Sequence, residues 1–310
     1  MSNSNQAKGD EYKHQAEKKL KSFGFFSNKY EDAAEYFEKA GNSYKLAKAW
    51  TEAAECFGKL ADCHLKCESK HEAASSYVEA AKMAAKTKPQ MSTELLQHAI
   101  GLYTDMGRLN MAARQLRELA EMNEKQGQKE EALAFHEQAA DLFDTDGSSS
   151  EATKSRIKIA EFSAELGRYP RAVEMFEEAL KRAVGNNLLK FSARGYILNA
   201  GICLLCYASP SEIERKLEEY HDVDMQFRDS REANLLQGLL EALQKGDDGL
   251  FATHLAEYDS ICRLDSWKTK ILLQAKRRIQ DMELGVGGND DDGGGGDDGS
   301  GEDDDEDDLL

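Results

Sequence analysis

The sequence predicts an all-α protein: a tetratricopeptide-like solenoid of antiparallel helical hairpins, capped by a C-terminal helical bundle and followed by a disordered acidic tail. Three observations support this fold class. Ala, Glu, Lys and Leu, which favour helix, dominate the body, and the 310 residues include only three prolines. A short cassette recurs about every twenty residues. The last 26 residues consist mainly of Gly, Asp and Glu.

The repeated cassette begins with an acidic residue and two alanines, followed by an aromatic residue and further small residues one turn later. Twenty residues accommodate one helix and one turn, so two cassettes would form a hairpin. Small alanines let neighbouring helices approach closely, while the aromatic ring fills the space beside them. Clear copies lie at 32–40, 52–61, 72–81 and 131–140, looser copies at 111–120, 151–160 and 171–180, and a degenerate copy near position 93.

Helix breakers are expected between the cassettes. Glycine ends helices because it adopts the left-handed conformation without steric cost. The candidate breakers are Gly41-Asn42, Gly107, Gly127, Gly147 and Gly167, and the last four are spaced by twenty residues.

Past about Leu188 the cassette fades and the apolar runs lengthen, at 197–208 and 233–243, before a final helix at 265–284. We therefore predict a solenoid over 1–187, with a hydrophobic loop near 22–29, and a helical bundle over 188–284. The tail, 285–310, carries 12 acidic residues, 9 glycines and no Lys or Arg. It cannot bury enough apolar surface to offset its ordering entropy, so we expect it to be disordered.

Charge and hydropathy exclude several functions. The net charge is −18, and the tail accounts for −12 of it, so residues 1–284 carry −6. A general nucleic-acid binder needs a cationic excess, so we expect no nucleic-acid partner. The longest apolar run, Ile202 to Ala208, is far too short to span a bilayer. The polar start has no signal-peptide core, and six cysteines then indicate reduced thiols in the cytosol.

No catalytic or cofactor motif stands out, and we expect neither an enzyme nor a cofactor. Phosphate-binding GxxxxGK[ST] and GxGxxG motifs are absent. Cys203 and Cys206 have metal or redox spacing but lie in an apolar run without a partner pair. A zinc site among Cys63, His64, Cys67 and His71 is the alternative to ordinary buried side chains, and we favour the buried side chains.

Seven ungapped motifs resemble the soluble NSF attachment proteins of the alpha/beta type. They are SFGFFS (22–27), SKHEAASSY (69–77), YTDMGR (103–108), LLKFSA (188–193), FRDSRE (227–232), EYDSICRLDSW (257–267) and the terminal DDLL (307–310). The resemblance covers residues 8–284 and the last residues. It implies a non-enzymatic adaptor that binds assembled SNARE complexes and recruits the hexameric ATPase NSF to disassemble them. It also implies several copies of the adaptor on each SNARE bundle, which includes syntaxin-type and other SNAREs.

The resemblance assigns a basic surface to SNARE binding. A curved solenoid with cations on one face would bind an acidic helical rod electrostatically. The positions that match the family's basic residues are Arg108, Arg114, Lys190 and Arg194, and, on a looser match, Lys154 and Lys158.

A second implied site is a membrane-attachment loop. Phe23, Phe25 and Phe26 lie among lysines in a loop between two polar helices. Packing against the first hairpin is the alternative to shallow insertion into an anionic bilayer. The family's paired phenylalanines correspond to Phe25 and Phe26, which favours weak, reversible membrane contact and a cytoplasmic, peripherally associated protein.

The third implied site, at the C-terminal end, would bind NSF. Glu241 matches a family acidic position, but the next two map to Gln244 and Lys245, so we expect the contact to shift toward Asp247 and Asp248. At the terminus, Leu309 matches the leucine that stimulates the ATPase, with Asp307, Asp308 and Leu310 beside it. Relatives lack the Gly/Asp insertion that precedes this motif.

A different function remains open at this point. A tetratricopeptide co-chaperone would clamp acidic peptide tails in a basic groove. It would need neither the phenylalanine loop nor the acidic DDLL terminus, so we favour the adaptor.

Overall fold

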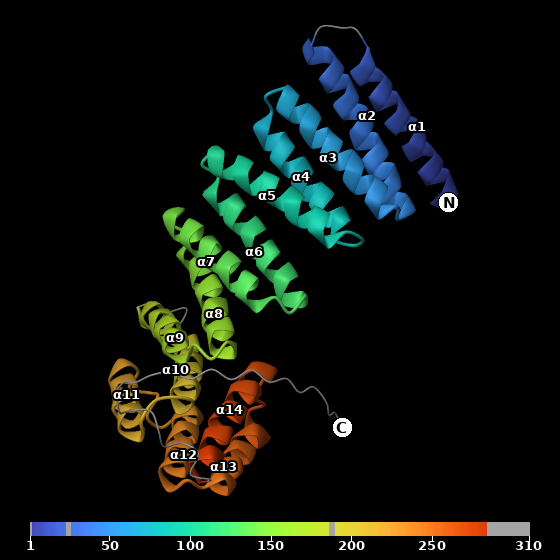
Figure 1. Ribbon diagram of the computed structural model, residues 1–310. Coiled ribbons are helices and arrows are strands. Elements are labelled where there is room, and N and C mark those ends of the chain that lie inside the picture. Colours follow the sequence, from blue (N-terminus) through green and yellow to red (C-terminus); the bar gives the residue numbers. More distant parts are fainter. Residues whose placement is uncertain (1, 23–25, 186–189, 284–310) are drawn as a thin grey trace, which may run out of the picture.

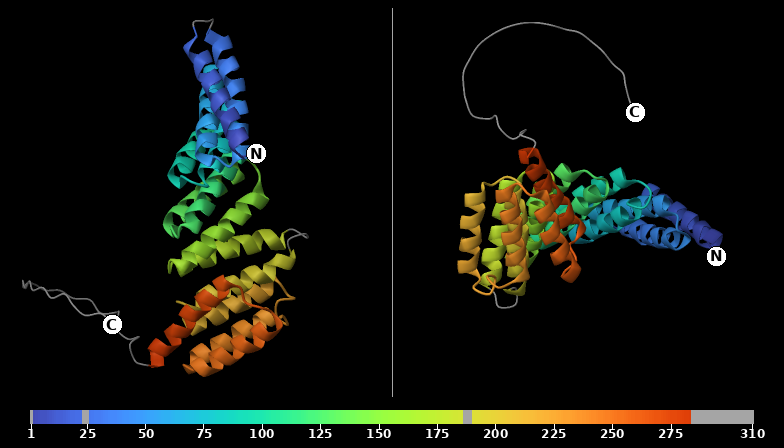
Figure 2. Two further views of the ribbon diagram at one scale, coloured as in Figure 1. Left: turned by 90° about the vertical axis from the view of Figure 1, so that its right-hand side faces the viewer. Right: turned by 90° about the horizontal axis from the view of Figure 1, so that it is seen from below.

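The computed structural model describes residues 2–22, 26–185 and 190–283, and within them every regular element is an α-helix (Figure 1). The molecule is elongated, with the N-terminal hairpin at one end and α11–α14 at the other (Figures 1 and 2). The first nine helices are α1 (Ser2–Lys21), α2 (Phe26–Ala47), α3 (Trp50–Lys66), α4 (Lys70–Ala84), α5 (Pro89–Asp105), α6 (Leu109–Lys125), α7 (Lys129–Thr145), α8 (Ser149–Glu165) and α9 (Tyr169–Val184). The last five are α10 (Lys190–Leu205), α11 (Pro210–Val223), α12 (Arg231–Lys245), α13 (Asp248–Ile261) and α14 (Ser266–Glu283).

Helices α1–α9 form the predicted solenoid, in which each helix packs chiefly on the next. The first alanine of each cassette lies at a helix–helix contact and is fully buried. This burial explains the cassette, because a larger side chain would force the two helices apart. These alanines are Ala33, Ala53, Ala73, Ala112, Ala132, Ala152 and Ala172.

Ion pairs and hydrogen bonds connect alternate helices and so define two layers. They link residues 34 to 42 positions apart, about one hairpin in sequence. Odd-numbered helices therefore lie beside odd-numbered ones, and even beside even. The ion pairs are Lys13–Glu55, Lys59–Glu17, Lys45–Glu79, Arg117–Glu151, Lys158–Glu124, Arg168–Glu130 and Arg171–Glu137.

The four predicted glycine breakers end α5, α6, α7 and α8 in the same way. Gly107, Gly127, Gly147 and Gly167 all have φ between 67° and 78°. The amide after each glycine donates to the carbonyl five residues earlier, as Arg108 does to Tyr103 at 2.8 Å. This hydrogen bond is the Schellman arrangement, which satisfies a carbonyl that the helix end would otherwise leave unpaired.

The prediction that Gly41-Asn42 breaks a helix is wrong. Gly41 lies inside α2, and a Cβ atom built on it would be 2.9 Å from the Phe57 ring. A glycine is therefore required at position 41 by the close packing of α2 on α3. The turn comes seven residues later at Lys48, and the next one at Glu68; each has φ of 60° although neither is glycine.

The C-terminal helices share a single core with the end of the solenoid. One buried cluster extends from Ala160 in α8 to Ile279 in α14. Helix α10 packs on α9, α12 and α14, and its second half is buried by them, which explains the apolar run that begins at Ile197. At its centre a Cβ on Gly201 would lie 2.5 Å from Leu236, so α10 and α12 approach very closely. The division of the chain near 187 stays a prediction, since packing continues from α9 to α10.

Candidate functional site

Three of the predicted basic residues occupy equivalent positions on successive even-numbered helices. Arg114 lies on α6, Lys154 on α8 and Arg194 on α10, spaced by forty residues, the length of one hairpin. Each follows directly after a buried residue, namely Ala113, Thr153 and Ala193. We call Arg114, Lys154 and Arg194 the cation row. Its spacing was not recognised from the sequence, although the twenty-residue period contains it.

Contacts between α6 and α8 hold the first two members of the cation row side by side. Arg117 pairs with Glu151, and Asn110 donates to Ser148 Oγ at 2.7 Å. Lys158 also reaches Glu124 at 4.0 Å. Neither Arg117 nor Asn110 was singled out in the sequence.

The arginines at the start of α6 are the least engaged cations of this surface. Arg108 immediately precedes Leu109, the first residue of α6, and Arg114 lies in the second turn of that helix. Both are exposed, and neither forms an ion pair with any residue that the structure describes. Their guanidinium groups are therefore available to an acidic partner without loss of an internal pair.

The two lysines of α8 are paired within their own helix. Lys154 donates to Glu151 at 2.6 Å and keeps 62% of its side chain exposed. Lys158 donates to Glu161 at 2.8 Å. Partial burial acts to lower the pKa of Lys158, but the hydrogen bond to Glu161 and the surrounding carboxylates together raise it. Lys158 thus stays charged at neutral pH.

At the end of the cation row, Arg194 bridges to the segment after α11. Its guanidinium donates to Gln226 Oε1 at 3.0 Å and lies 3.8 Å from Asp224, which is buried. The backbone of Lys190 begins α10, but its side chain falls outside the described part of the chain. The structure therefore brings five of the six predicted basic side chains into view.

The predicted acidic residues near the end of α12 have different roles. Glu241 is exposed and accepts from Lys245 at 2.5 Å, one helical turn away. Asp247 caps α13 by accepting from the Leu250 amide at 2.8 Å. Asp248 accepts from Gln280 at 2.8 Å, and this bond, together with Lys276 at 3.4 Å, lowers its pKa. Glu241 is thus the acid least committed to the fold itself.

Two other predicted sites fall wholly or partly outside the described residues. Phe23, Phe25, Asp307, Asp308, Leu309 and Leu310 are not described, and of Phe26 only the backbone at the start of α2 is. The neighbouring helix end carries Lys18, Lys19 and Lys21. Across the described ranges, no helix is both long and apolar enough to cross a membrane.

The cysteines considered as metal or redox candidates are buried or half-buried side chains. Burial raises the pKa of the Cys63 thiol to about 12 and that of Cys203 well above its usual value. Cys206, whose pKa burial raises to about 12, lies 3.5 Å from the Ile271 carbonyl. Among the residues described, no three His, Cys, Asp or Glu side chains are grouped to hold a metal ion.

A stacked, two-layered array of helical hairpins with charged side chains at regular intervals defines a helical-repeat scaffold. The family model described as "Soluble NSF attachment protein, SNAP" matches residues 7–280. The chain belongs to this family, which confirms the resemblance drawn from its motifs.

Curated relatives match nearly their whole length. The alpha-soluble NSF attachment protein of Vitis vinifera is 38% identical over 89% of this chain and 96% of the relative. That of Mus musculus is 37% identical over 87% and 94%. A probable vesicular-fusion protein sec17 homolog of Schizosaccharomyces pombe is 36% identical over 88% and 97%. Among solved structures, a tetratricopeptide repeat protein from Parabacteroides merdae covers 87% of this chain and 99% of that chain, with 11% identity and a TM-score of 0.32.

Proposed function

We propose that this protein is an adaptor that binds assembled SNARE complexes through the cation row and recruits NSF for their disassembly in vesicle fusion and transport. The observation that carries the proposal is the spacing of Arg114, Lys154 and Arg194 on alternate helices of one layer. Successive helices of that layer would present positive charge along an extended acidic partner such as a helical bundle. Membership of the family supports this function over the peptide-clamping co-chaperone.

Binding at this surface would depend on salt. Arg108 and Arg114 are exposed and lack ion pairs within the described chain, so a partner carboxylate adds an interaction without replacing one. Lys154 would have to exchange Glu151, but Arg117 remains paired with that carboxylate. Exposed charges are screened over about 8 Å at physiological ionic strength, so affinity should fall steeply as salt is raised.

The first experiment measures binding to a purified SNARE complex. The double variant Arg114→Glu/Lys154→Glu should bind at least tenfold more weakly, since two attractive contacts become repulsive. Arg215→Glu is a control for charge reversal at another site, because Arg215 is an exposed arginine on α11 that pairs within its own helix, with Glu219. Equal affinity of the double variant and the wild type would contradict the assignment of the cation row.

NSF recruitment belongs to the opposite end of the chain. We assign it to Glu241, the tail and Leu309, with Asp247 and Asp248 contributing charge. In a reconstituted assay with SNARE complex, NSF and ATP, Leu309→Ala should retain SNARE binding but lose stimulated disassembly. Unchanged disassembly by this variant would remove Leu309 from the proposal.

Weak membrane contact through Phe25 and Phe26 completes the proposed mechanism and makes the protein peripheral on cytoplasmic membranes. The support is the basic end of α1, with Lys18 and Lys21 beside the loop. Phe25→Ser/Phe26→Ser should abolish cosedimentation with vesicles that contain anionic lipid while leaving SNARE binding in solution intact. Several copies on each SNARE bundle would make such weak contacts add.

A further inference from the structure

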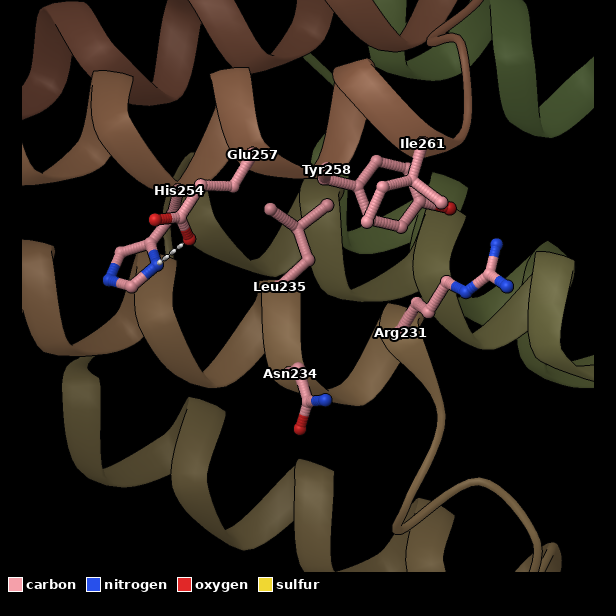
Figure 3. Close-up of a pocket in the computed structure, with 7 residues that line it drawn as sticks. All are labelled: Arg231, Asn234, Leu235, His254, Glu257, Tyr258 and Ile261. Atoms are coloured by element: carbon pink, nitrogen blue, oxygen red, sulfur yellow. Dashed lines mark ion pairs between the residues drawn. The ribbon is translucent and has the colours of Figure 1, made fainter.

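A groove between α12 and α13 lies away from the cation row. Its floor is apolar, formed by Leu235 from α12 and by Tyr258 and Ile261 from α13 (Figure 3). Its volume is about 180 Å³, and Ile261 is 66% exposed. Burial of this exposed isoleucine side chain by a partner would contribute favourable binding free energy.

The charged side chains around the groove differ in whether they already have a partner. Glu257 lies 3.8 Å from His254, a contact that is an ion pair only when the imidazole is protonated (Figure 3). Asp259 lies 3.5 Å from Arg263 and also accepts from the Leu264 amide. Arg231, at the first turn of α12, forms no ion pair with any described residue. The groove therefore offers an apolar floor, with one unpaired cation next to the positive end of a helix dipole and the carboxylates of Glu232 and Glu257 at its edge.

We propose that the C-terminal residues Leu309 and Leu310 of the same chain occupy this groove, with Arg231 binding the terminal carboxylate or the aspartates before it. The chain beyond Glu283 contains two other aliphatic residues, Leu284 and Val286, both close to the end of α14, before this leucine pair. The leucine pair at the end of the tail therefore matches the apolar floor of the groove, and its terminal carboxylate can pair with Arg231.

The tail is long enough to reach. The end of α14 lies beside the start of α13, because Gln280 and Lys276 both contact Asp248. The groove is at the far end of α13, a helix of 14 residues and so about 20 Å long. A Gly-rich chain from Glu283 to Leu309 spans about 25–30 Å. The mean length of the tail therefore matches the distance to the groove. This match gives the leucine pair an effective concentration at the groove on the order of millimolar.

The consequence rests on the proposed function, in which Leu309 stimulates NSF. A docked leucine pair is withheld from the ATPase until the tail is displaced. The Gly/Asp insertion then acts as the tether of a reversible autoinhibitory contact rather than as a passive spacer.

Cys262 supplies a native reporter of the groove. It directly follows Ile261, its side chain interacts with that of Tyr258, and it is the exposed one of the six cysteines. A docked tail should shield it from a maleimide, with the labelled site read by mass spectrometry on the full-length chain. We expect Cys262 in the variant Leu309→Asp/Leu310→Asp to be labelled about fivefold faster than in wild type. This ratio follows from a millimolar effective concentration of the tethered leucines and a submillimolar dissociation constant for the contact.

Two control variants separate docking of the leucine pair from a general effect of charge in the tail. Val286→Asp makes the same kind of change elsewhere in the tail and should keep the protection, whereas Arg231→Gln should weaken it. Protection should not vary with protein concentration; an increase with concentration would assign the groove to a second copy and overturn the proposal. Equal labelling of the wild type and the leucine variant would also overturn it. Labelling involves neither SNARE complex nor NSF, so a negative result leaves the adaptor function standing.

Discussion

His136 is predicted to make the protein sensitive to acid. This side chain is only 2% exposed on α7 and stacks on Phe162 of α8, with ring centroids 5.9 Å apart. Neither ring nitrogen has a hydrogen-bond partner among the described residues, and the cations Lys158 and Arg117 are close enough to act on the ring. Burial first, and then these two cations, lower the pKa of His136 from 6.5 to about 4. The imidazole is therefore neutral in the folded protein at all but acidic pH.

The sign and size of the effect follow from this shift. Between about pH 6.5 and pH 4 the unfolded chain binds a proton at this position and the folded chain does not, so the free energy of unfolding falls as pH falls. A shift of about two and a half units corresponds to roughly 3 kcal/mol at the acidic end of that window. At pH 7.5 both states are neutral, and only the cost of the unpaired ring nitrogens remains, roughly 1 kcal/mol after loss of the stacking.

The variant His136→Leu tests this reasoning by urea unfolding followed by circular dichroism. Its stability should exceed that of wild type by roughly 1 kcal/mol at pH 7.5 and by roughly 3–4 kcal/mol at pH 4.5. The variant His98→Leu is the control, because His98 is exposed and water can solvate its imidazole in both the folded and the unfolded protein. If wild type and His136→Leu lose stability in parallel between these pH values, the buried imidazole is not the cause.

Three further predictions concern the helix ends and the closest helix contact, all measurable by urea unfolding. Lys48→Gly should stabilise by roughly 0.5–1 kcal/mol by relieving a positive φ, and Gly147→Ala should destabilise by about 1 kcal/mol; the same sign for both would contradict the turn geometry. Asp247→Ala should cost about 1 kcal/mol by removing the cap of α13, while Asp247→Ser should restore most of it. Gly201→Ala should cost roughly 1–3 kcal/mol through its clash with Leu236, and Leu236→Ala should make that substitution less costly than it is alone.

The regular part of the fold was predictable from the sequence because its cause is local. The alanines of the cassette lie where helices touch, and the glycines at 107, 127, 147 and 167 adopt the conformation that favours glycine. The turns at Lys48 and Glu68 were not predictable, since side chains that disfavour positive φ give no signal there. Gly41 gave the wrong signal, because a glycine required by packing has the same letter as one required by a turn.

The candidate site was predictable in its residues but not in its organisation. Motif positions gave Arg114, Lys154 and Arg194 individually, and only the layered fold reveals that they repeat with the hairpin. Cross-layer partners such as Glu151 depend on how hairpins stack. The groove at Ile261 depends on how α12 and α13 pack together, and only the apolar run of α12 at 233–243 was visible in the sequence.

The way the cores are divided has a mechanical consequence. Contacts in α1–α9 are mainly between consecutive helices, whereas α10 in the C-terminal block also contacts α12 and α14. In a chain of consecutive helix–helix contacts, the small deformations at each contact add. The N-terminal part of the chain, up to α7, should therefore bend and twist easily, while the C-terminal block resists deformation. A torque applied at α11–α14 would then be transmitted to Lys154 on α8 with little loss. The flexible helices α1–α7 would adapt to the curvature of the bound partner.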